Sequence, residues 1–149
     1  MSERVEQAVN LFVDGYSCAQ SILAVYGPSL GVEKNAALRL AAPLGGGLSR
    51  TDGPCGAATG ALLVLGLKFG HSHPEDEESA ERIRNLTQDY LSRYDERKGS
   101  TMCTDILGHN LSLPGVPEKV KEGQLAAETC PDVVRTAAQL LEEYLETEF

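Results

Sequence analysis

Residues 55–69 read Cys-Gly-Ala-Ala-Thr-Gly-Ala-Leu-Leu-Val-Leu-Gly-Leu-Lys-Phe, and we expect the rest of the chain to pack around them. Their apolar side chains would cover every side of an α-helix, and a helix that is apolar all round is buried. Gly56 and Gly60 lie four residues apart, so they share a helix face that another backbone can approach closely. The stretch therefore predicts a buried central helix that starts at Cys55.

Apolar residues at helical spacing continue on both sides of this stretch. Ser17 and Gln20 fit a capping box at the start of the second helix. Residues 45–54 are rich in glycine and predict an irregular loop, and no strand-like alternation of useful length is present. The other predicted helices cover residues 5–13, 17–26, 33–42, 72–99 and 101–107, with a long last helix from Cys130 or Pro131. The expected fold is all-α, a single-domain helical bundle over residues 1–149.

Composition and charge exclude several classes of function. Of the 149 residues, 42% are hydrophobic and 23% charged, which indicates a folded domain rather than disorder. The formal net charge of -9 repels phosphate backbones, so we expect no nucleic-acid partner. The longest apolar stretch, residues 57–67, is too short to span a membrane, and the polar N-terminus lacks a signal-peptide pattern. A cytoplasmic protein without membrane insertion is expected.

Four cysteines are the residues that point to chemistry. In a reducing compartment, they indicate metal ligands or redox-active thiols rather than permanent disulfides. No two of them form the Cys-x-x-Cys pair that is typical of zinc knuckles and thioredoxins. Each is instead expected at the cap or in the first turn of a separate predicted helix. These residues are Cys18, Cys55, Cys103 and Cys130.

Helix starts matter because their unpaired amides and partial positive charge favour thiolate over thiol. Four such starts that point to one place would form a cationic pocket for four thiolates. We therefore predict that the four cysteines converge. Taken singly, each cysteine is equally well explained as a small buried hydrophobic residue.

The cysteines and their flanking residues resemble a family of redox-active proteins named for the pattern Cys, then Cys-Gly-Ala-x-x-Gly, then Cys, then Cys. The resemblance runs from about residue 9 to residue 138 and includes the glycine run at 45–47. The matching segments are Ser17-Cys18-Ala19-Gln20, Cys55-Gly56-Ala57-Ala58-Thr59-Gly60, Cys103 within residues 99–108, and Cys130. It implies a small helical protein with a redox function in which the four cysteines are the defining residues.

The resemblance does not supply a reaction, so three interpretations stay open. The leading one is an iron-sulfur or iron centre for electron transfer, held by all four cysteines. The second is metal-free thiol-disulfide exchange, with Cys55 near Arg50 as the nucleophile because positive charge lowers a thiol pKa. The third is a non-enzymatic domain with a structural zinc ion on the four cysteines. Each of these assigns the site to Cys18, Cys55, Cys103 and Cys130.

The sequence does not specify the redox partner or decide between an enzyme and an electron carrier. The protein is expected to be an oxidoreductase or an electron carrier that works with a redox partner protein or a small molecule. The helix face with Gly56 and Gly60 would serve a homo-oligomer contact as well as an internal one.

The remaining candidates are expected to be structural. His71 and His73 form a His-x-His sequence in a loop, where histidines more often face water than hold a metal ion. His109 is a weak candidate for a proton donor near the third cysteine. Tyr90 and Tyr94 belong to the apolar stripe of a helix and are expected to pack there with their hydroxyls in water.

Overall fold

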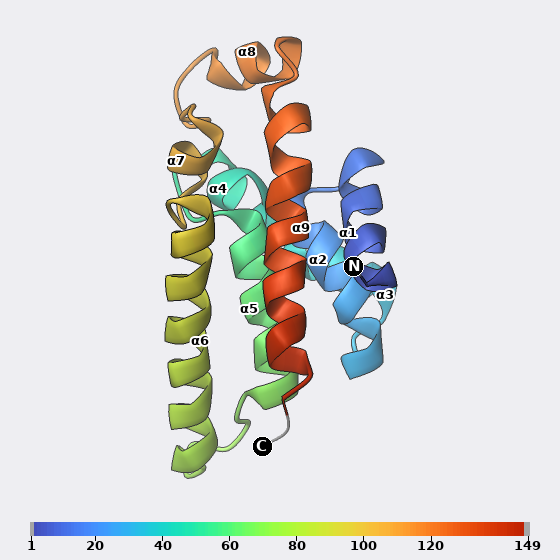
Figure 1. Ribbon diagram of the computed structural model, residues 1–149, viewed down its shortest axis with the longest axis vertical. Coiled ribbons are helices and arrows are strands. Elements are labelled where there is room, and N and C mark those ends of the chain that lie inside the picture. The colour runs from blue at the N-terminus through green and yellow to red at the C-terminus, as the bar shows by residue number, and fades with distance from the viewer. Residues whose placement is uncertain (1, 148–149) are drawn as a thin grey trace.

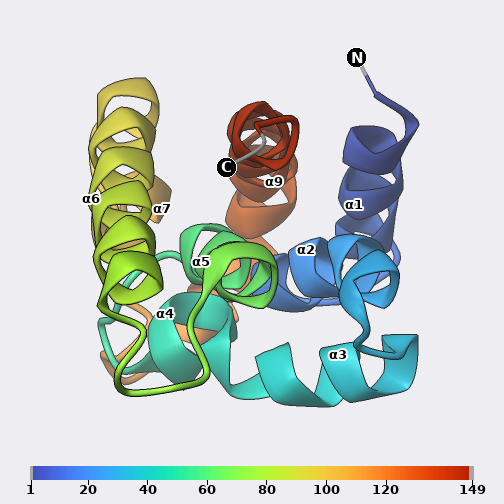
Figure 2. The same ribbon diagram turned by 90° about the horizontal axis from the view of Figure 1, so that it is seen from below.

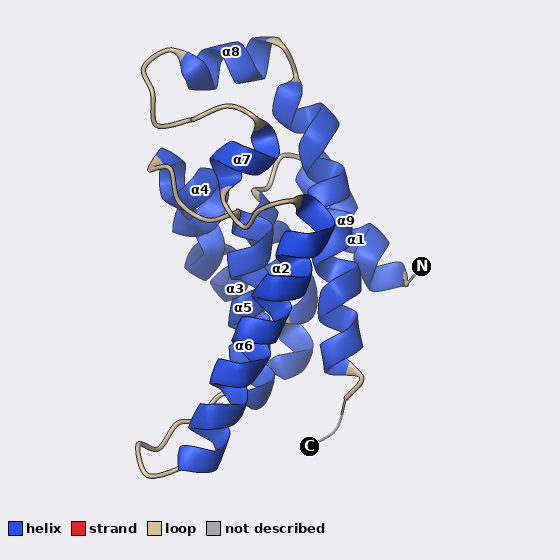
Figure 3. Cartoon of the chain, turned by 60° about the vertical axis from the view of Figure 1, so that its left-hand side comes forward, coloured by secondary structure: helices blue, strands red, loops and turns tan. Residues whose placement is uncertain are grey.

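The computed structural model describes residues 2–147, and residues 1, 148 and 149 lie outside the described part. Over the described residues the fold is all-α, as predicted, with no strand and with one isolated β-bridge between Pro54 and Met102 (Figure 3). None of the helices in this range is both long enough and apolar enough to cross a membrane. The helices are α1 (Glu3–Val13), α2 (Cys18–Tyr26), α3 (Lys34–Ala41), α4 (Gly45–Arg50), α5 (Gly56–Phe69), α6 (Glu77–Lys98), α7 (Cys103–Leu107), α8 (Val116–Glu122) and α9 (Leu125–Leu145), with 3-10 turns at Pro28–Leu30 and Ala42–Leu44.

Helix α5 lies in the middle of the molecule, where it contacts α2, α6 and α9 (Figure 1). In the view of Figure 2, α5 and α2 lie between one row of helices formed by α6, α9 and α1 and a second row formed by α3 and α4. The hydrophobic core cluster draws buried residues from α1, α2, α3, α5, α6 and α9. The predicted central position of the helix that follows Cys55 is therefore confirmed.

The glycine face of α5 packs against α2. A Cβ atom built on Gly60 would lie 3.0 Å from the carbonyl oxygen of Ala19 and 3.1 Å from its Cα. A Cβ atom on Gly56 would lie 3.3 Å from the backbone nitrogen of Ala19. The predicted close approach is thus an internal contact, and it brings the start of α2 against the start of α5.

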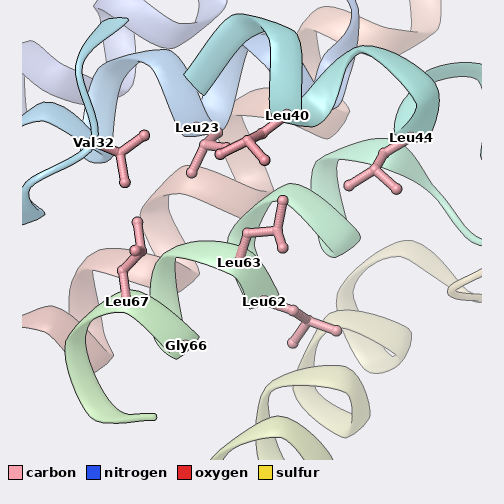
Figure 4. A pocket seen from close by; sticks show the side chains of 8 residues that line it. All are labelled: Leu23, Val32, Leu40, Leu44, Leu62, Leu63, Gly66 and Leu67. Carbon is pink, nitrogen blue, oxygen red and sulfur yellow. The ribbon is translucent and has the colours of Figure 1, made fainter. Parts of the chain in front are cut away.

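The prediction that this helix is buried on all sides is wrong for its second half. Leu63 is 38% exposed and Leu67 is 40% exposed. Both face α3 across an open apolar groove with a volume of about 450 Å³, which α3 covers only in part (Figure 4). The groove is lined by Leu23, Val32, Leu40, Leu44, Leu62, Leu63, Gly66 and Leu67.

The glycine-rich segment before α5 is more ordered than the predicted irregular loop. In α4, Gly46, Gly47, Leu48 and Ser49 have φ angles between +58° and +71°, which form a turn of left-handed helix. Such backbone costs roughly 1–2 kcal/mol for each residue that is not glycine. Hydrogen bonds hold it: the carbonyl oxygen of Gly47 accepts from the backbone nitrogen of Gly53 at 2.9 Å, and the Ser49 hydroxyl donates to a backbone carbonyl at 2.7 Å.

The predicted start of the last helix is also wrong. Helix α9 begins at Leu125, so Cys130 and Pro131 lie inside the helix and not at its start. Proline is favoured in the first helical position, which made Pro131 a reasonable start signal. The helix nevertheless begins five residues before Cys130, and its later residues, including Val133 and Val134, are buried in the core.

Candidate functional site: a cavity lined by four cysteines

The four cysteines line the same cavity, so the predicted convergence is confirmed. The cavity has a volume of about 120 Å³, and most of its other lining residues are apolar. Cys55 is buried with 5% of its surface exposed, while Cys18, Cys103 and Cys130 are partly exposed. The four cysteines therefore lie around one cavity between α2, α5, α7 and α9 although they are far apart in sequence.

Cys18 is held by the predicted capping box at the start of α2. The Ser17 hydroxyl accepts a hydrogen bond from the backbone nitrogen of Gln20 at 3.2 Å. The Gln20 side chain accepts one from the backbone nitrogen of Ser17 at 3.0 Å. Because both bonds form, the first turn of α2 is fixed and Cys18 is its first residue.

Cys55 and Cys103 are placed by the isolated β-bridge. The backbone nitrogen of Cys55 donates to the carbonyl oxygen of Thr101 at 2.7 Å, and that of Cys103 donates to the carbonyl oxygen of Gly53 at 3.1 Å. The left-handed turn packs directly behind this pair, since a Cβ atom on Gly47 would lie 2.9 Å from the Cβ of Cys103. Backbone bonds therefore fix the positions of two cysteines that are 48 residues apart.

The side chains of Cys18 and Cys130 interact within the cavity that both line. This interaction lowers the pKa of Cys130 and raises the pKa of Cys18, as expected when a neutral Cys18 thiol donates to a Cys130 thiolate. The ammonium group of Lys98 also lowers the pKa of Cys130. Lys98 is held in place by an ion pair with Asp132, with Nζ 2.6 Å from Oδ2.

Cys55 does not have the lowered pKa that the sequence predicts. Burial raises its pKa, and this effect is larger than the opposing hydrogen bonds from the Tyr94 side chain and from the backbone amides of Ala57 and Ala58. Those amides belong to the first turn of α5, so the helix start favours the thiolate as expected. The removal of the sulfur from water has a larger effect on the pKa than the helix start has. The structure therefore does not support the prediction that Cys55 is a nucleophile whose pKa is lowered by the positive charge of Arg50.

The start of a helix does not set the pKa of any of the other three cysteines either, and the physical reason differs from one to the next. Burial raises the pKa of Cys103 to about 11, although Cys103 is the first residue of α7. Cys18 is the first residue of α2, yet its pKa is raised by the interaction with Cys130 and by burial. Cys130 has the lowered pKa but lies inside α9, beyond the first turn, where the effect of the helix start has faded.

A metal centre in the cavity would need the cysteine side chains to be arranged around it as ligands. Among the described histidine, cysteine, aspartate and glutamate residues, no group of three or more is placed to hold one metal ion. Tetrahedral iron or zinc sites need four ligands at bonding distance of one centre. The four cysteines nevertheless line one cavity, so a metal centre held by all four of them stays a prediction.

The sequence did not predict that Tyr94 and Lys98 lie at this site. The Tyr94 hydroxyl lies 3.2 Å from the Cys55 sulfur, in a fully buried position, and not in water as expected. Lys98 lies one turn further along α6 and acts on Cys130. Their spacing of four residues places them on one helix face, but no signal in the sequence shows that this face points to the cysteines. His71, His73 and His109 are exposed and do not line the cavity.

Comparison with known proteins gives one family. No curated protein and no solved structure matches the chain. A family model described as "Putative redox-active protein (C_GCAxxG_C_C)" matches residues 16–144. Its label writes the second block with glycine before cysteine, whereas residues 55 and 56 here are Cys-Gly. Since the match covers well over half of the chain and contains all four cysteines, the protein belongs to this redox-active protein family.

Proposed function

We propose that the cysteine cavity carries out thiol-disulfide exchange, with Cys18 and Cys130 as the working pair. The observation that carries this proposal is that both cysteines line one cavity, where each side chain shifts the pKa of the other. Cys18 and Cys130 are each partly exposed, whereas Cys55 is buried.

The reaction follows from the protonation states of the pair. The Cys130 thiolate attacks one sulfur of a substrate disulfide, which forms a mixed disulfide and releases the other sulfur as a thiolate. Cys18 then loses its proton to that thiolate and attacks the Cys130 sulfur. The second substrate thiolate leaves, and a Cys18-Cys130 disulfide remains. Two electrons pass from the cysteine pair to the substrate, and the reverse sequence oxidises a substrate dithiol.

Cys55 and Cys103 take no part in this first exchange. The raised pKa of each keeps it protonated near neutral pH, and a thiol is a poor nucleophile compared with a thiolate. Cys55 is in addition almost fully buried. Their contribution is to line the cavity beside the reacting pair.

A metal centre is the second candidate, and the observation in its favour is that all four cysteines line one cavity. An iron-sulfur centre would supply one-electron transfer, and a zinc ion would supply stability without redox chemistry. Metal analysis of protein purified without air tests this candidate.

The exchange proposal predicts an ordered pH dependence of thiol alkylation. With iodoacetamide and peptide mapping, Cys130 should react at a pH below that of an ordinary cysteine, because its lowered pKa keeps it ionised there. Cys103 should react only as the pH approaches 11. Replacing Cys18 by alanine should shift the Cys130 profile to higher pH, and Lys98→Gln should shift it in the same direction.

The matched control is Lys119→Gln, which removes an exposed lysine of α8 and should leave the profile unchanged. A Cys130 profile that does not respond to Cys18→Ala would show that the two thiols do not interact in solution. In that case the exchange proposal is wrong.

A further inference from the structure

A row of three tyrosines connects the cysteine cavity with the surface of the protein. The chain has only eight aromatic residues, five of which are tyrosine. Three of these five pack in ring-to-ring contact between α6 and α9. They are Tyr94, Tyr90 and Tyr144, in order from the cavity outward.

The inner end of the row touches the redox site. The Tyr94 hydroxyl and the Cys55 sulfur lie 3.2 Å apart. Within residues 2–147, every buried nitrogen and oxygen atom of a side chain has a hydrogen-bond partner. Tyr94 stacks on Tyr90 with ring centroids 6.1 Å apart and an angle of 19° between the ring planes. Both rings are completely buried, so they form a water-free bridge from Cys55 into the core.

The outer end of the row has a proton acceptor. The Tyr90 and Tyr144 ring centroids are 5.7 Å apart. Tyr144 is 6% exposed, and its hydroxyl donates a hydrogen bond to the carboxylate of Asp89, which faces solvent. The guanidinium of Arg93 lies over the Tyr144 ring, 5.4 Å from its centroid. A tyrosine loses an electron readily only when its proton can leave at the same time. The carboxylate of Asp89 can accept the proton of Tyr144.

We propose that these tyrosines conduct single electrons from Cys55 to an oxidant at the surface near Tyr144. This inference rests on the proposed function only in that the Cys130 thiolate on the same cavity receives the Cys55 proton. The oxidant belongs to the class of one-electron oxidants, such as a diffusing inorganic radical. Through the tyrosines, such an oxidant would oxidise a cysteine of the cavity by a route separate from disulfide exchange.

The electrons and protons balance in two steps. The oxidant takes one electron from Tyr144, and the phenolic proton moves to Asp89. An electron from Cys55 then reaches the Tyr144 radical across the rings of Tyr94 and Tyr90, and Asp89 returns the proton to Tyr144. Cys55, which has lost one electron, gives its thiol proton to Cys130. The products are the reduced oxidant, a Cys55 thiyl radical and a protonated Cys130.

The azide radical, generated by pulse radiolysis, is a suitable probe because the chain contains no tryptophan to compete with tyrosine. Tyr16 is 38% exposed and lies outside the row, so all measurements should be made in a Tyr16→Phe background. The tyrosyl absorption should then decay at a rate independent of protein concentration. A spin trap followed by peptide mapping should label Cys55.

Two variants test the row itself. Tyr94→Phe keeps the ring but removes the contact with Cys55, and Cys55→Ala removes the electron donor. Each should lengthen the tyrosyl lifetime several-fold and abolish the spin-trap label at Cys55. An unchanged lifetime in both variants, or a tyrosyl radical with no label at Cys55, would overturn the proposal.

A third variant separates this inference from the proposed function. Tyr144→Phe should remove the entry point for the radical and so lower the Cys55 label. It should leave disulfide exchange by Cys18 and Cys130 unchanged, because it lies outside their cavity. Loss of disulfide exchange with an intact tyrosine relay, or the reverse, identifies which of the two proposals fails.

Discussion

Cys130→Ser is expected to slow the reaction of the reduced protein with a small disulfide by roughly one to two orders of magnitude at neutral pH. Burial still raises the pKa of each remaining thiol in this variant, although Cys18 loses the part of its shift that Cys130 causes, and the pKa of Cys103 is about 11. Each pKa unit costs about tenfold in thiolate, while the greater intrinsic nucleophilicity of a more basic thiolate recovers about half of this on a logarithmic scale. Stopped-flow measurement with an aromatic disulfide reagent, under exclusion of air, gives the rate directly.

Cys18→Ser should give a different result, because it removes the second step and keeps the first. Cys130 should still attack the reagent, and the mixed disulfide should accumulate because its nearest partner thiol is gone. Mass spectrometry of the intact protein detects the added mass. Cys103→Ser is the control, and it should behave as the unmodified protein does. If Cys103→Ser slows the reaction as much as Cys130→Ser, the pair has been assigned incorrectly.

Gly47→Ala is expected to destabilise the protein strongly. Gly47 has a φ angle of +71°, where a residue with a Cβ costs roughly 1–2 kcal/mol. The new Cβ would also lie 2.9 Å from the Cβ of Cys103 and 3.1 Å from the carbonyl oxygen of Gly53, and overpacking of this kind costs about 1–3 kcal/mol. Denaturant unfolding should show the sum of the two effects as a lower free energy of unfolding.

Gly99→Ala separates these two contributions. Gly99 has a φ angle of +81° at the end of α6, but no atom lies within 4 Å of a Cβ built on it. It should show only the backbone cost. Equal losses of stability in the two variants would mean that Gly47 is not packed against Cys103, and that the left-handed turn does not position this cysteine.

The all-α fold could be predicted from the sequence because its signals are local. The apolar stretch at residues 57–67 and the capping box at Ser17 each specify a helix without reference to the rest of the chain. The glycine pair at 56 and 60 likewise predicted the close approach that α2 makes. The same helix starts indicated where the cysteines converge, since α2 and α5 pack together at these ends.

The errors arose where distant contacts override local signals. Pro131 indicated a helix start, but the helix begins at Leu125, so Cys130 lies inside α9. The helix start at Cys55 does favour the thiolate, yet burial by the surrounding core raises the pKa. The interaction between Cys18 and Cys130 spans most of the chain, and no local pattern specifies it.

The most direct test of the account is the disulfide map of protein that was reduced, purified without air and then oxidised with one equivalent of a small disulfide. The account predicts one new disulfide, between Cys18 and Cys130, with Cys55 and Cys103 still alkylated as free thiols. A bond between any other two cysteines would contradict it. So would four thiols that resist both oxidation and alkylation until a chelator removes bound iron or zinc.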